Sequence, residues 1–166
     1  MVWGLPAETL LQIHVWLSVI GIVTGIVALY GFLTGYLYGL MTGLFLLTTS
    51  LTNVTGFPLP PHGIDPPRIV GVISLALLAL AIAAIYVFHL AGHWRWIFVV
   101  TAVASLYLNV FVAIVQAFQK LTFLKPLAPT QSEPPFLIAQ LLALGLFVAL
   151  GVVALIRFRP AAEAGT

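Results

Sequence analysis

Five long runs of apolar residues dominate the chain, separated by short breaks that contain proline, glycine or charged residues. A helix that crosses a membrane needs about 20 mostly apolar residues in succession. Each run reaches that length, so the pattern predicts an all-α integral membrane protein, a five-helix transmembrane bundle that forms a single domain over residues 1–166. The expected spans cover residues 9–33, 35–57, 68–90, 94–120 and 134–158.

The breaks predict how the helices connect. As one helix the first two runs would measure roughly 70 Å, more than twice the hydrocarbon thickness, so we expect a tight turn near Gly35. Proline lacks an N–H and fixes φ, so the Pro-rich connections at residues 58–67 and 125–135 must lie outside the hydrocarbon. Five spans place the N-terminus and both Pro-rich connections on one side, called side A, and the C-terminus on side B.

Composition supports a membrane protein and excludes several chemistries. Charged residues make up 6% of the 166 residues, whereas soluble domains average about 25%. The absence of cysteine excludes disulfides, thiolate catalysis and iron–sulfur clusters. A formal net charge of +2 rests on too few groups to indicate a nucleic-acid partner. The expected partners are the lipid bilayer and either other membrane subunits or a second copy of the chain.

Lysine and arginine, which set membrane orientation, are balanced between the two sides. Three lie on each: Arg68, Lys120 and Lys125 on side A, and Arg95, Arg157 and Arg159 on side B. Two of the side-B arginines, Arg157 and Arg159, directly flank the end of the last span. We therefore expect the N-terminus and the Pro-rich loops outside and the C-terminus in the cytoplasm, in a bacterial inner membrane.

Small residues recur at helical spacing on the first two runs. In lipid, helices associate through close packing of small residues. The first run carries a stripe of this kind, and the second carries glycines four residues apart, which fit either a dimerisation face or packing of the second helix against the first. The residues are His14, Ser18, Gly21, Gly25 and Ala28 on the first run, and Gly35, Gly39 and Gly43 on the second.

Every predicted helix also places a polar residue near its side-A end, whereas the side-B halves are nearly all aliphatic and aromatic. Polar groups in hydrocarbon normally face the bundle interior. They form either a hydrogen-bonded network that fixes helix register or a pocket for a lipid headgroup or quinone ring. The candidate ligand contacts are Gln12, His14, Asn53, Arg68, Asn109, Gln116 and Gln140.

Histidine positions bear on haem and metal binding. Haem b in a membrane bundle usually needs two imidazoles at matching depth, but His14 lies near side A whereas His89 and His93 lie near side B. A haem bound between two copies of the chain, with one His14 from each, is compatible with the sequence. His62 and Asp65, in the first Pro-rich loop, are the candidate metal ligands.

The sequence contains no phosphate-binding loop, no nucleophile elbow and no pair of carboxylates within a span. We therefore expect a non-enzymatic protein: an accessory subunit, an assembly factor, or a binder of a small lipid-like or quinone-like ligand at side A. The alternative is a membrane redox protein that binds haem b or quinone.

Two strings carry a resemblance to a known group of proteins. Residues 52–57 (TNVTGF), with His62 and Gly63 after them, and residues 127–136 (LAPTQSEPPF) resemble segments of small, uncharacterised bacterial multi-span inner-membrane proteins. That resemblance implies a membrane bundle and no particular activity. The histidine early in the first run is also distantly similar to that of small haem- or quinone-handling membrane proteins.

Overall fold

The computed structural model describes residues 4–59 and 66–160, and these residues form helices joined by short connections, without any strand. The π-helical turn η1 continues α3, and the short 3₁₀ turn η2 lies in the loop between α4 and α5. The elements are α1 (Ala7–Thr34), α2 (Gly39–Gly56), α3 (Pro66–Ile82), η1 (Ala83–Val87), α4 (Trp94–Lys120), η2 (Lys125–Leu127) and α5 (Pro134–Arg157).

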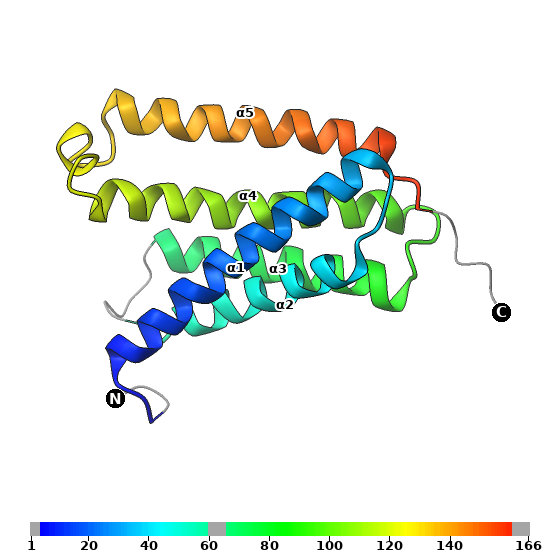
Figure 1. Ribbon diagram of the computed structural model, residues 1–166, viewed down its shortest axis with the longest axis horizontal. Coiled ribbons are helices and arrows are strands. Elements are labelled where there is room, and N and C mark those ends of the chain that lie inside the picture. The colour runs from blue at the N-terminus through cyan, green and yellow to red at the C-terminus, as the bar shows by residue number, and fades with distance from the viewer. Residues whose placement is uncertain (1–3, 60–65, 161–166) are drawn as a thin grey trace.

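The helices run along the long axis of the molecule in alternating directions (Figure 1). α4 and α5 lie side by side, α2 and α3 form the opposite side of the bundle, and α1 crosses obliquely between them. The start of α1 and the loop from α4 to α5 lie at one end, which corresponds to side A. The turn from α1 to α2 and the end of α5 lie at the other end, side B.

Four helices are long and apolar enough to cross a membrane: α1, α3 with η1, α4 and α5. They match four of the five predicted spans. α2 is less apolar, because seven of its 18 residues are Thr, Ser or Asn. Its hydroxyls donate mostly to carbonyls one turn earlier in the same helix, as Thr52 does to the Thr48 carbonyl at 2.8 Å.

The turn between α1 and α2 is longer than predicted. Gly35 ends α1 in the left-handed conformation, with φ at 86°, and its N–H faces the Gly31 and Phe32 carbonyls. Glycine adopts this conformation without a Cβ penalty. α2 therefore begins at Gly39, and the predicted ridge of three glycines on one helix is wrong at its first member.

Close packing of α1 against α2 and α4 forms the centre of the bundle. Gly21, Gly25 and Ala28 are buried on one face of α1. At Gly25 an added Cβ would lie 2.6 Å from Leu106 Cδ1 on α4 and 2.8 Å from Phe45 Cδ2 on α2. The stripe of small residues on the first run thus packs within the chain.

An aromatic cluster closes the bundle at side B. Phe32 of α1 packs edge-on against Phe98 of α4 at 5.3 Å and against Phe158 at 4.9 Å between ring centroids. Arg95 reaches the same place, and its Nη1 donates to the Leu155 carbonyl at 3.3 Å and the Phe158 carbonyl at 2.5 Å. These carbonyls lie at the end of α5, where no further helical turn supplies donors.

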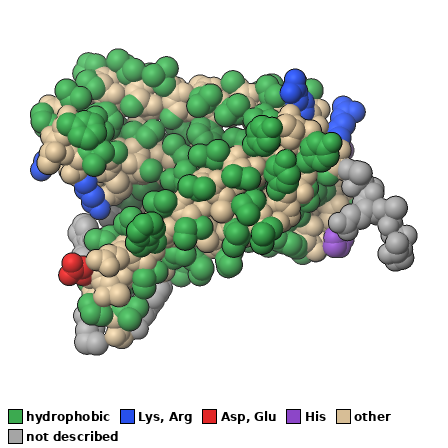
Figure 2. Space-filling model, in the orientation of Figure 1, with side chains coloured by type: hydrophobic (Ala, Val, Ile, Leu, Met, Phe, Trp, Pro, Cys, Tyr) green, Lys and Arg blue, Asp and Glu red, His purple; other side chains and the backbone are tan. Residues whose placement is uncertain are grey.

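The outer surface is apolar between two charged ends. Figure 2 shows Lys and Arg at both ends of the molecule and hydrophobic side chains over the face between them. α5 is the most exposed span, with 17% of its most apolar window buried. Leu141 and Leu142 on it are 66% and 69% exposed. Such a surface is consistent with a membrane-embedded protein.

The α1 contacts generate a prediction about stability. Gly25→Ala should destabilise the protein by about 1–3 kcal/mol, because the new methyl group overpacks a site closed by two buried side chains. Gly145→Ala is the matched control, since nothing lies within 4 Å of an added Cβ there. Thermal unfolding in detergent measures both. A midpoint for Gly25→Ala equal to that of Gly145→Ala would contradict the packing.

Candidate functional site

The first polar contact at side A joins α1 to α2. His14 is half-buried, and its Nδ1 lies 3.2 Å from Thr55 Oγ1. The Thr55 hydroxyl also donates to the Leu51 carbonyl at 2.8 Å. Which atom donates between Thr55 and His14 depends on the tautomer of the imidazole.

Two further side-chain hydrogen bonds join α2 to α3 and α1 to α4. Asn53 on α2 donates through Nδ2 to Ser74 Oγ on α3 at 3.0 Å. Ser18 on α1 donates to Asn109 Oδ1 on α4 at 2.8 Å. Asn109 lies 11 residues before the end of α4, near the middle of this 27-residue helix. This second contact is therefore much deeper than the predicted layer.

Gln140 and Arg68 are also bonded to main-chain carbonyls. Gln140 is buried on α5, and its Nε2 donates to the Phe111 carbonyl of α4 at 3.2 Å. Arg68, near the start of α3, donates to the Phe57 and Leu59 carbonyls that follow α2, at 3.2 Å and 2.6 Å from Nη2. Arg68 therefore binds the chain after α2 at side A much as Arg95 binds the end of α5 at side B.

The bonded site residues thus each contact a neighbouring helix or the chain after it, but these hydrogen bonds join none of the seven predicted ligand contacts to another. Gln116 is half-buried, and Gln12 is exposed on α1. The predicted metal ligands His62 and Asp65 lie outside the described residues. Within residues 4–59 and 66–160, no group of three His, Asp or Glu side chains could hold a metal ion.

Sequence reasoning missed the hydroxyls in the side-B half of the interior. These hydroxyls extend the buried polar groups from the side-A layer into the side-B half. The sequence signal that could have found them is the recurrence of Thr and Ser at helical spacing on α2 and α4. The buried side chains concerned are Thr24, Thr42, Thr101 and Ser105. The hydroxyls of Thr42 and Thr49 and the Nδ2 of Asn109 have no hydrogen-bond partner in the described part of the chain.

A hollow of about 370 Å³ opens at side A between the end of α4 and the loop to α5. Its lining mixes apolar groups, amides, a hydroxyl and one cation. The lining residues are Phe118, Gln119, Lys125, Ala128, Pro129, Thr130 and Gln131. We call it the side-A hollow. None of the seven predicted ligand contacts lines it, and five of its lining residues belong to the predicted Pro-rich connection 125–135.

The loop beside the side-A hollow is held by Gln131. Its backbone is left-handed, with φ at 60°, which is uncommon for a residue other than glycine. Its side chain accepts from Gln119 Nε2 at 3.2 Å and donates to the Val115 carbonyl at 3.0 Å. A strained residue fixed by two side-chain bonds is a reason to suspect function.

Apolar and acidic groups complete the support of this loop. Ala128 is buried among α4 and α5 side chains, and Phe118 packs edge-on against Phe136 at 5.5 Å. Glu133, just before α5, accepts from the Thr130 hydroxyl at 2.9 Å and from the Ser132 N–H at 3.1 Å. The loop is therefore supported by contacts among its own residues and with α4 and α5.

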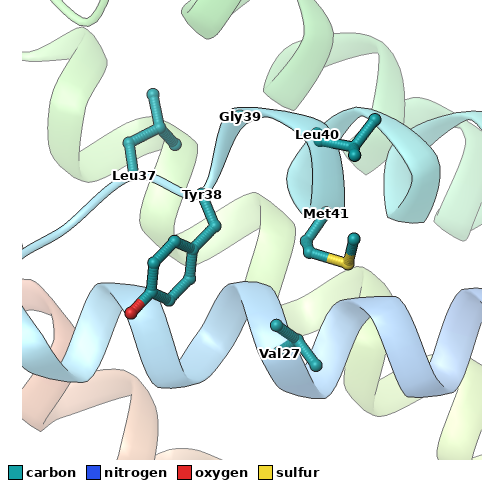
Figure 3. Close-up of a pocket in the computed structure, with 6 residues that line it drawn as sticks. All are labelled: Val27, Leu37, Tyr38, Gly39, Leu40 and Met41. Atoms are coloured by element: carbon teal, nitrogen blue, oxygen red, sulfur yellow. The ribbon is translucent and has the colours of Figure 1, made fainter.

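A second hollow, of about 400 Å³, lies at side B where α1 turns into α2. Figure 3 shows the Tyr38 ring reaching toward α1, with Met41 and Val27 approaching each other across the gap. The remaining lining residues are Leu37, Gly39 and Leu40. Apart from the tyrosine hydroxyl its side chains are apolar, so it offers little to orient a polar ligand.

Glu133 makes the loop sensitive to acid. Desolvation is the largest single influence on the pKa of Glu133 and raises it. Hydrogen bonds from the Thr130 hydroxyl and from the N–H groups of Thr130 and Ser132 together outweigh desolvation and hold the pKa below its ordinary value of 4.5. The carboxylate thus stabilises the loop fully above pH 4.5, and this contribution is lost as the pH falls through the lowered pKa.

We therefore expect the amides of Thr130 and Ser132 to be protected from hydrogen exchange above pH 4.5 and to lose protection as the pH falls below it. Glu133→Gln should lose protection at neutral pH, because a neutral amide oxygen accepts weaker bonds than a carboxylate. Glu8→Gln, an exposed change at the start of α1, is the control. Equal protection in both variants would refute the role of Glu133.

Comparison with known proteins gives no relative from which a function could be carried over. No protein-family model, no curated protein and no solved structure matches this chain.

Proposed function

We propose that this chain is a non-enzymatic, multi-pass membrane protein, an accessory or assembly subunit, that binds a small amphipathic ligand of lipid or quinone type in the side-A hollow. The observation that carries the proposal is the mixed lining of that hollow. Apolar Phe118 and Ala128 line it together with amide, hydroxyl and ammonium groups. Pockets of about 300–1,000 Å³ with an apolar wall and a few fixed polar groups are typical of small-ligand sites.

The side chains that line the side-A hollow are already held in place, which also supports ligand binding there. Gln131 is fixed by bonds to Gln119 and Val115 before any ligand arrives, so binding would order few side chains. A ligand that meets an already ordered site avoids part of the entropy cost of association.

We further propose that α2 is a fifth span. Its 18 residues would extend about 27 Å, close to the hydrocarbon thickness of about 30 Å. Five of its threonines are buried, so the groups that lower its hydropathy face the protein interior. The alternating directions of the helices also favour crossing by all five.

Five spans in a bacterial inner membrane predict termini on opposite sides, with side A outside and the C-terminus in the cytoplasm. Of the six cations, Arg68 and Arg95 bond to main-chain carbonyls, which leaves two exposed at each end. The orientation therefore rests on Arg157, the last residue of α5, and Arg159 just after it. Reporter fusions to each terminus test it: both reporters on one side would leave four spans and refute the proposal for α2.

Ligand retention tests the proposed function itself. Protein purified in mild detergent should retain a lipid-like or quinone-like molecule, detected by extraction and mass spectrometry. Gln131→Ala should lower its occupancy about tenfold, the loss expected for two hydrogen bonds that fix the hollow. Gln12→Ala, an exposed amide on α1, should leave it unchanged. No retained molecule, or equal loss in both variants, would refute ligand binding here.

His14 supports a second candidate, a redox protein that binds haem b or quinone. Its Nδ1 lies 3.2 Å from Thr55 Oγ1, which orients the ring, and in the tautomer with the proton on Nδ1 the Nε2 lone pair is left for an axial ligand bond. Of the histidines in residues 4–59 and 66–160, His89 and His93 lie at side B, whereas two copies of His14 would offer two axial imidazoles at one depth. A Soret band that His14→Ala abolishes is the signature of this candidate.

A further inference from the structure

We propose that the ligand of the side-A hollow is the phosphate-bearing headgroup of an anionic membrane lipid, held by Lys125. This inference rests on the proposed function and names the chemical class of its ligand. It distinguishes the two ligand classes of that proposal, because a lipid headgroup of this kind carries a negative charge and a quinone ring carries none.

The position of the hollow suits a headgroup. α4 has 27 residues, or roughly 40 Å, which exceeds the hydrocarbon thickness of about 30 Å. Its last turn and the loop that follows therefore reach the headgroup region. The hollow lies at that level, between the end of α4 at Lys120 and the start of α5 at Pro134.

Two lysines flank the start of the loop beside the hollow: Lys120 ends α4 and Lys125 begins η2. Lys120 and Lys125 are both exposed, and no ion pair in the described part of the chain occupies either ammonium group. The nearest carboxylate in sequence, Glu133, already accepts two bonds from Thr130 on one oxygen and a bond from Ser132 on the other. The lysines are thus available to a phosphate.

Apolar side chains on the same loop suit the acyl chains. Leu121, Phe123 and Leu127 are 43%, 69% and 50% exposed. Exposed leucine and phenylalanine beside lysine is the pattern of segments that sit in the membrane interface. A headgroup in the hollow would therefore have its acyl chains next to side chains that prefer hydrocarbon.

Thermal unfolding in a neutral detergent tests the inference, with dioleoylphosphatidylglycerol as the probe and dioleoylphosphatidylcholine as its uncharged counterpart. The anionic lipid should stabilise the wild type at lower concentrations than the zwitterionic one. Lys125→Gln should weaken this effect about fivefold, the loss expected for one lysine near an anionic surface, and Lys125→Arg should retain it. Arg157→Gln, an exposed cation at side B, is the matched control.

Three outcomes would overturn the inference. Equal stabilisation by the two lipids would show that charge is not recognised. Equal weakening by Lys125→Gln and Arg157→Gln would show that the lipid responds to net charge alone. Stabilisation by glycerol 1-phosphate at the concentrations at which the lipid acts would identify a soluble phosphate compound as the ligand.

The same variants keep this inference separate from the proposed function. If a quinone is retained and lost in Gln131→Ala while the anionic lipid has no selective effect, the hollow is a ligand site and the headgroup assignment is wrong. If neither molecule depends on Gln131 or Lys125, both proposals fail.

Discussion

The structure depends on the close approach of α1 to α2 and α4, because helices in lipid gain little from the hydrophobic effect when they associate. At Gly21 an added Cβ would lie 2.7 Å from Thr49 Oγ1, and at Gly25 it would lie 2.6 Å from Leu106 Cδ1. The backbone of α1 thus serves as the packing surface. This contact brings Ser18 within reach of Asn109 and gives the bundle its polar centre.

Two arginines fix the ends of the bundle in equivalent ways. Arg68 binds the carbonyls that follow α2, and Arg95 binds those at the end of α5. Each satisfies main-chain acceptors that a helix end leaves free. Basic residues that a sequence count treats as orientation signals therefore hold adjacent antiparallel helices in register, which weakens that count as a guide to topology.

The sequence predicted where the helices begin and end better than which of their side chains contact one another. α4 begins at Trp94 and ends at Lys120 as predicted, since charged and aromatic residues mark both ends. The pairing of Asn53 with Ser74 depends on helix rotation, which spacing alone does not determine. The side-A hollow was also out of reach, because it requires the left-handed backbone of Gln131 and a bond to Val115 sixteen residues away.

The aromatic cluster at side B sets an order for assembly. Phe32 belongs to the first helix and Phe98 to the fourth, but Phe158 follows the last helix. While the chain is being made, the residues of the first four helices are synthesised before Phe158, so both rings and the Arg95 guanidinium lack their final partners until then. A residue after α5 thus completes a contact that begins in α1, and a chain that stops before Phe158 keeps its apolar helices but lacks this aromatic closure at side B.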